Sequence, residues 1–175
     1  MIVITTLNKI RSHDPCRDGW EKLLRGLGKT RADDEPLNIA TIIDINGLDD
    51  ALWCLRAVEG HDREIRLYAV WCARRVEHLM TDPRSVAVLD VAERYARGEV
   101  SDEELRAAAC AAVWAAAWTM AAAACAAEAA ACAAVWAAEW AVEAARAAMR
   151  SAAVGDTERA AQAAELRRIC GEAKP

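Results

Sequence analysis

Residues 109–118 read ACAAVWAAAW, and residues 131–140 read ACAAVWAAEW. Nine of the ten positions match, at an offset of 131 − 109 = 22 residues. Because 22 is twice eleven, and eleven residues make about three helical turns, each copy places one cysteine and two tryptophans on a single helix face. The first copy contributes Cys110, Trp114 and Trp118, and the second contributes Cys132, Trp136 and Trp140.

The repeat lies in a long segment that lacks helix breakers. Ser101-Asp102-Glu103-Glu104 has the composition of a capping box, and neither glycine nor proline follows until Gly155. An unbroken helix of this length would extend about 75 Å. Two geometries remain open, a continuous helix and a hairpin of two helices broken within residues 119–131. A final short helix is expected over Asp156 to Cys170.

Glycine, proline and capping residues divide the first hundred residues into short helices. Asp14-Pro15 would cap and open a helix whose apolar stripe ends before Gly28, and Leu37 to Ile45 is expected to be helical because the sequence offers it no partner strand. The stripe consists of Cys16, Trp20, Leu23, Leu24 and Leu27; the other helices are expected over 7–12, 48–58, 62–80 and 83–97. The sequence therefore predicts an all-α protein, with an N-terminal multi-helix domain over 1–99 and an Ala/Trp-rich helical region over 100–175.

Composition excludes several classes of partner. The net charge is −5, with 17 acids against 15 bases in residues 1–100 and 10 against 7 in residues 101–175. Neither half carries the basic surface that nucleic acid requires. Residues 107–127 are uncharged and long enough to span a bilayer, but alanine inserts poorly compared with leucine or isoleucine, so we expect no membrane span. The odd count of seven cysteines and the lack of a signal peptide indicate reduced thiols in a cytoplasmic protein.

The sequence contains no local signature of catalysis. No cysteines are spaced as a Cys-x-x-Cys metal site, no motif joins a nucleophile to a base, and no glycine-rich phosphate loop follows a strand. We therefore expect no enzyme activity, no metal and no cofactor. Four arginines, Arg63, Arg66, Arg74 and Arg75, could line an anion-binding pocket. The simpler interpretation pairs them with Asp62, Glu64 and Glu77 on the helix surface.

Three helical segments, residues 48–58, 66–76 and 90–98, together with the Ala/Trp repeat, resemble a known group of proteins. Over residues 5–170 the chain is similar to small helical proteins with Ala/Trp repeats that phages and prophages carry. Over residues 48–150 it resembles immunity proteins of bacterial toxin systems. Members of the group have more charged residues between the alanines, and the sparse charge here favours packing or assembly. The resemblance implies a role in conflict between phage and host, by binding rather than catalysis.

The expected function is therefore inhibition of a host defence complex by protein–protein binding in the cytoplasm of a bacterial host. The tryptophans Trp114, Trp118, Trp136 and Trp140 are the candidates for partner binding or for assembly with a second copy of the chain. Two alternatives stay open. One is a sponge that sequesters a signalling nucleotide in the arginine-lined pocket, and the other is an immunity protein that neutralises a toxin.

Overall fold

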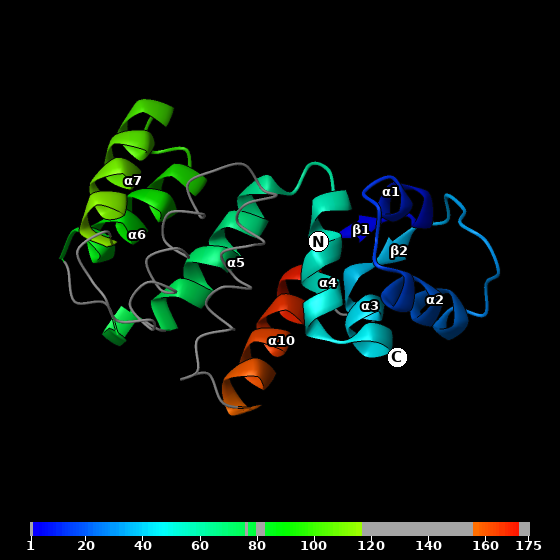
Figure 1. Cartoon of the computed structure of the whole chain (residues 1–175). Coiled ribbons are helices and arrows are strands. Elements are labelled where there is room, and N and C mark those ends of the chain that lie inside the picture. The colour runs from blue at the N-terminus through cyan, green and yellow to red at the C-terminus, as the bar shows by residue number, and fades with distance from the viewer. Residues whose placement is uncertain (1, 76, 80–82, 117–155, 172–175) are drawn as a thin grey trace. The chain divides into compact units, whose positions relative to one another are not determined.

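The computed structural model describes residues 2–75, 77–79, 83–116 and 156–171, with the backbone alone for residues 79, 85, 109 and 111–116. Helices account for 72% of the described residues and strands for 3%, so the all-α prediction is confirmed at this level (Figure 1). The chain forms two compact units, one of residues 1–61 and 160–175 and the other of residues 62–159. This grouping differs from the predicted division at residue 99, because the helices on either side of that position pack together.

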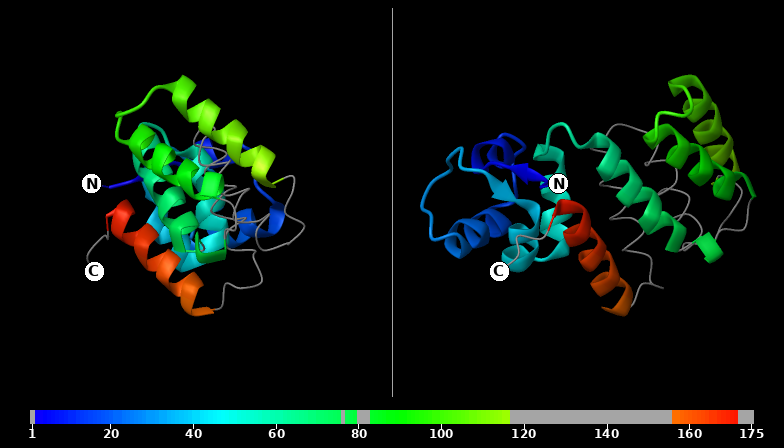
Figure 2. Two further views of the ribbon diagram at one scale, coloured as in Figure 1. Left: turned by 90° about the vertical axis from the view of Figure 1, so that its left-hand side faces the viewer. Right: turned by 180° about the vertical axis from the view of Figure 1, so that it is seen from behind.

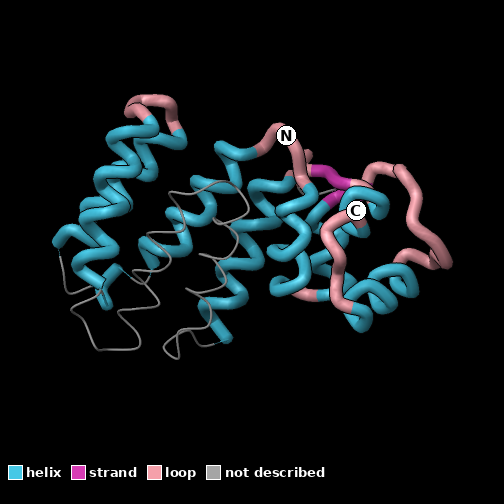
Figure 3. The backbone as a smooth tube through the Cα atoms, turned by 45° about the horizontal axis from the view of Figure 1, so that its top comes forward, coloured by secondary structure: helices cyan, strands magenta, loops and turns pink. Residues whose placement is uncertain are grey.

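The first unit is built from short helices and one pair of strands. Its elements in chain order are β1 (Ile4–Thr5), α1 (Leu7–Arg11), α2 (Arg17–Gly26), β2 (Leu37–Asn38), α3 (Ile39–Asn46), α4 (Leu48–Cys54), the 3-10 turn η1 (Leu55–Ala57) and most of α10 (Asp156–Cys170). Figure 3 shows the long loop that connects α2 to β2. The core consists of fully buried aliphatic side chains, among them Leu7, Ile10, Ile42, Leu52 and Leu166.

The strand pair corrects the prediction of helix from Leu37. Leu37 and Asn38 pair antiparallel with Thr5 and Ile4, and the helix begins only at Ile39, where the Asn38 side chain accepts a hydrogen bond from the Ala40 amide at 2.7 Å. A partner strand does exist, but its two residues are too short for an alternating pattern to reveal it. Thr5 adds a buried tie, since its hydroxyl donates to the Ala57 carbonyl at 2.5 Å.

The start of α2 also differs from the prediction. Asp14 adopts a left-handed backbone with φ of 52°, so it does not cap the helix, and α2 begins at Arg17 with Cys16 as an N-cap that makes no side-chain hydrogen bond. Cys16 is exposed, and of the predicted stripe only Leu23 is buried. By contrast, Thr6 caps α1, because its hydroxyl accepts a hydrogen bond from the Lys9 amide at 3.2 Å.

The second unit is helical in its described part. It contains α5 (Asp62–Arg75), the 3-10 turn η2 (Glu77–Leu79), α6 (Pro83–Ala96) and α7 (Asp102–Ala116). α6 packs against both α5 and α7, and the views of Figure 2 show α6 and α7 side by side. The core of this unit is formed by Tyr68, Cys72, Val88, Leu89 and Leu105.

The capping box at Ser101 forms only in part. The Ser101 hydroxyl accepts a hydrogen bond from the Glu104 amide at 3.3 Å, as predicted. The Glu104 carboxylate does not return to the Ser101 backbone; it pairs instead with Arg94 at 3.3 Å. Helix α7 is thereby joined to α6 by a charged contact at its first turn.

Tryptophan contributes less to the described core than composition suggests. Trp20, Trp53 and Trp71 are each half-buried, and arginine guanidinium groups cover two of the rings, Arg56 over Trp53 at 4.5 Å and Arg75 over Trp71 at 5.0 Å. The described core is therefore aliphatic, with Tyr68 as its one fully buried aromatic side chain.

Candidate functional site

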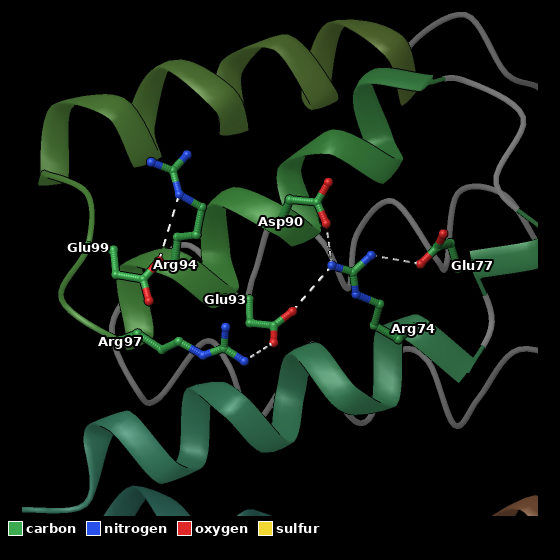
Figure 4. Close-up of polar contacts among 7 residues, drawn as sticks. All are labelled: Arg74, Glu77, Asp90, Glu93, Arg94, Arg97 and Glu99. Carbon is green, nitrogen blue, oxygen red and sulfur yellow. Dashed lines mark hydrogen bonds and ion pairs between the residues drawn. The ribbon is translucent and has the colours of Figure 1, made fainter.

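Arg74, one of the four arginines predicted to bind an anion, lies at the centre of a cluster of carboxylates near the end of α5 (Figure 4). Its Nη1 donates to Glu77 Oε2 at 3.0 Å. Its Nη2 contacts Asp90 and, at 3.3 Å, Glu93 Oε2, both on α6. Glu93 also accepts a hydrogen bond from Arg97 Nη2 at 2.5 Å.

The electrostatics of this cluster do not favour an additional anion. Burial acts to lower the pKa of Arg74, but the hydrogen bonds that its guanidinium donates to Asp90 and Glu77 outweigh burial and raise the pKa above its ordinary value. Three carboxylates, Glu77, Asp90 and Glu93, face two guanidinium groups, so the formal charge is 2 − 3 = −1. An incoming phosphate would have to displace a carboxylate that is already well placed.

The other three predicted arginines do not join Arg74 in one site. Arg75 pairs with Glu158 and lies over Trp71, whereas Arg66 lies over the ring of Tyr95 at 5.1 Å. Arg63 is exposed at the start of α5. Positions 66 and 74 are eight residues apart on one helix, about 12 Å along its axis. These contacts favour the simpler interpretation, in which the arginines pair with acidic side chains on the helix surface. The predicted pair of Arg74 and Glu77 is present.

The predicted tryptophan face falls mostly outside the described residues. Trp118, Trp136 and Trp140 lie there entirely, and for Trp114 only the backbone is described, as part of α7. In the first copy of the repeat, the side chain of Cys110 is described. Leu105 is 3% exposed within the unit that α6 and α7 share, whereas Cys110 is exposed. Five residues rotate by about 140° around a helix, so Cys110 lies on a different side of α7 from Leu105.

Sequence reasoning missed one feature of the first unit, an open hollow of about 460 Å³. The end of α1, the first turns of α2 and loop residues 30–32 form its walls. Trp20 and Leu24 supply apolar surface, and Arg11, Arg17 and Arg31 supply positive charge. The signal in the sequence was the apolar stripe itself, in which Trp20 and Leu24 are four residues apart.

The described cysteines and carboxylates do not assemble a metal site. No group of three or more histidine, cysteine or acidic side chains lies close enough to hold an ion within the described ranges. Cys54, Cys72 and Cys170 are buried, and Cys16 and Cys110 are exposed. Burial raises the pKa of the Cys170 thiol to about 12, so this group stays protonated at neutral pH.

Comparisons with known proteins give no relative. No family model matches the chain, and neither a curated protein nor a solved structure matches it. Among the helices that the structure describes, none combines the length and the apolar character needed to cross a bilayer.

Proposed function

We propose that this chain is a non-catalytic binding protein that recognises another protein through the face formed by Trp114, Trp118, Trp136 and Trp140. The observation that carries the proposal is the division of α7 into two faces. Leu105 is buried within the helical unit, whereas Cys110, the first residue of the repeat face, is exposed. Exposed aromatic side chains at regular spacing are typical of partner sites, and alanine at the intervening positions lets a partner helix approach closely.

The biological role that fits this binding mode is inhibition of a host defence complex by a phage- or prophage-encoded protein. The resemblance to phage-carried Ala/Trp-repeat proteins supports it. Neutralisation of a toxin by an immunity protein would use the same mode of binding, in which a helix face contacts one protein partner. The described contacts of Arg74 and Arg75 favour protein binding over capture of a signalling nucleotide on α5, because carboxylates already pair with both guanidinium groups.

Replacement of Trp118 and Trp140 by alanine tests the proposal. Alanine preserves helix propensity, so the double variant should keep its circular dichroism spectrum and its melting temperature. It should lose the ability to restore phage plaques on a bacterial strain that carries the inhibited defence system. Trp53→Ala, which removes a half-buried tryptophan outside the repeat, is the matched control and should retain that activity.

Two outcomes would contradict the proposal. A large fall in melting temperature, of the size expected when about 3–5 kcal/mol of core packing is lost, would assign the tryptophans to the core. A double variant that keeps its stability, its oligomeric state and its biological activity would leave the repeat without a role in binding.

A further inference from the structure

We propose that the hollow between α1, α2 and loop residues 30–32 binds a small ligand that joins a flat aromatic ring to a phosphate, of the class of a nucleoside monophosphate. The proposal does not depend on the tryptophan repeat, because the hollow lies wholly within residues 11–32 of the first unit. It also differs from the arginine-lined pocket expected on α5, since it uses a different set of arginines.

The apolar part of the hollow suits an aromatic ring. Trp20 and Leu24 are four residues apart on α2, so they lie on one face of the helix. Both side chains remain half-buried, although neighbouring Leu23 is 2% exposed. A half-exposed indole beside a leucine in a concave wall offers a flat surface on which a planar ring can stack.

The polar part of the hollow is positively charged. Arg11, Arg17 and Arg31 line it together with a single acid, Asp14, which gives a formal charge of 3 − 1 = +2. Glu21 pairs with Arg17 at 2.7 Å and reduces the effective charge to about +1. The Arg11 guanidinium makes no ion pair with any described residue. This balance is opposite in sign to that around Arg74, where carboxylates outnumber guanidinium groups.

The backbone at the edge of the hollow adds to its attraction for an anion. Helix α2 begins at the lining residue Arg17, and the side chain of its N-cap residue Cys16 makes no capping hydrogen bond. Uncapped amides at a helix N-terminus carry partial positive charge and bind phosphate readily. Asp14, just before this point, has the left-handed φ of 52°, and among the described residues it is the one non-glycine residue with such a backbone. Strain of this kind is concentrated at functional sites.

The size of the hollow selects the ligand class. Small-molecule sites in proteins occupy about 300–1,000 Å³, and a volume of about 460 Å³ is at the lower end of that range. A planar fork of guanidinium donors matches the oxygens of a phosphate. A mononucleotide satisfies both halves of the site, whereas inorganic phosphate would not contact the indole surface and a free nucleoside would bring no anion to Arg11 and Arg31.

Isothermal titration calorimetry of the full chain tests the proposal. The probes are AMP, GMP, UMP, inorganic phosphate, adenosine and a 5′-phosphorylated oligonucleotide. We expect at least one monophosphate to bind saturably, and at least tenfold more tightly than phosphate or adenosine. Arg11→Gln with Arg31→Gln should weaken binding by tenfold or more. Arg25→Gln with Arg63→Gln is the matched control, because it removes the same charge from exposed positions outside the hollow and should change affinity by less than about twofold.

Replacement of Trp20 by leucine separates the two halves of the site. It should reduce the affinity for the monophosphate to that for inorganic phosphate while both arginines remain. Absence of saturable binding by every monophosphate at millimolar concentration would overturn the proposal. So would an equal loss in the two double-arginine variants, or binding of the oligonucleotide alone, which would identify a nucleic-acid strand as the ligand.

Discussion

The environment of each cysteine decides its chemistry in this protein. Cys170 is fully buried at the end of α10, and its carbonyl accepts a hydrogen bond from the Val3 amide at 3.1 Å. Cys54, Cys72 and Cys170 are buried, and each behaves as a small apolar side chain. Cys16, which was predicted to lie on the apolar stripe of its helix, is exposed instead, because α2 begins at Arg17 and leaves Cys16 outside the helix. The error arises from the backbone of Asp14, whose left-handed conformation a proline at the next position does not predict.

The buried thiol of Cys170 predicts a loss of stability in alkaline solution. Its pKa is raised by burial from 9.0 to about 12. Between these values the unfolded chain has released the proton and the folded chain has kept it, so rising pH favours unfolding. The free energy of unfolding should fall by about 1.4 kcal/mol for each pH unit in this window, and the thiol should have no effect on pH dependence below pH 9.

Urea denaturation at a series of pH values, from about pH 8 to about pH 11, measures this slope. The matched variant is Cys170→Ala, which is less stable at every pH because it loses packing but has no thiol to titrate. Its stability should fall less steeply than that of the unmodified chain above pH 9. If the free energy of unfolding falls with pH at the same slope in both proteins, then Cys170 titrates normally and is not buried as the structure describes.

At the scale of helices, local signals in the sequence predict where each helix begins and ends. Contacts between helices determine which charged side chains pair with one another. Pro83 and Gly98 bracket α6 as predicted, since α6 runs from Pro83 to Ala96. The pair of Arg74 and Glu77 follows from spacing on the chain. The contacts of Arg74 with Asp90 and Glu93 do not, because those acids are 16 and 19 residues away on another helix. Sequence reasoning therefore left open whether Arg74 could bind a ligand.

Replacement of Arg74 by methionine should destabilise the second unit. Methionine retains much of the length of the arginine stem, so the change chiefly removes the charge that holds Glu77, Asp90 and Glu93 together. Arg74 is 31% exposed, and solvent screening limits each pair to about 0.2–1 kcal/mol. We expect a loss of about 1–2 kcal/mol in the free energy of unfolding at low salt, falling as salt screens the remaining carboxylates.

Arg63→Met is the control for this experiment, because Arg63 is exposed on the same helix and belongs to the same predicted set. This substitution should change the free energy of unfolding by no more than about 0.5 kcal/mol. Chemical denaturation of both variants at low and high salt provides the comparison. Equal losses in the two variants, or a loss in Arg74→Met that salt does not reduce, would show that the carboxylate cluster contributes nothing specific.

At the scale of the whole molecule, the chain leaves the first unit after residue 61 and returns to it at residue 160. The sequence predicted the helix from Asp156 to Cys170 but not its position, because helical periodicity identifies an apolar face and not the surface that covers it. The buried residues of α10 in the structure are Gln162, Leu166 and Cys170, at intervals of four. The alanines of this helix and Ile169 are exposed or half-buried.

Contacts between the ends of the chain hold α10 in the first unit. Val3 donates to the Cys170 carbonyl, Asn38 Nδ2 donates to the Gly171 carbonyl at 3.2 Å, and Arg167 pairs with Asp44 at 2.7 Å. The hollow around Trp20 is also a product of tertiary structure, since α1, α2 and the following loop have to meet before it exists. Neither arrangement is encoded in a local motif, so neither could be predicted from the sequence.

A chain that ends at Gly155 should therefore lose the first unit and keep the second. Removal of α10 exposes the surface that Leu166 and Cys170 cover, and each buried apolar side chain of this size is worth about 1.5–3 kcal/mol. This loss of burial free energy is large compared with a typical free energy of unfolding of about 5–15 kcal/mol. In native-state hydrogen exchange, the amides of Ile10, Ile42 and Leu52 should lose protection.

The second unit supplies the internal reference for this truncation. Its described core, around Val88 and Leu89, is formed by α5, α6 and α7. The truncated chain loses the pair of Arg75 with Glu158 from this unit, a surface contact of small value. A chain that ends at Gly171 retains α10 and the Asn38 hydrogen bond, and should keep protection in both units. If the amides of Ile42 and Leu52 stay protected in the chain that ends at Gly155, then α10 is an appendage, and the first unit folds without the C-terminal part of the chain.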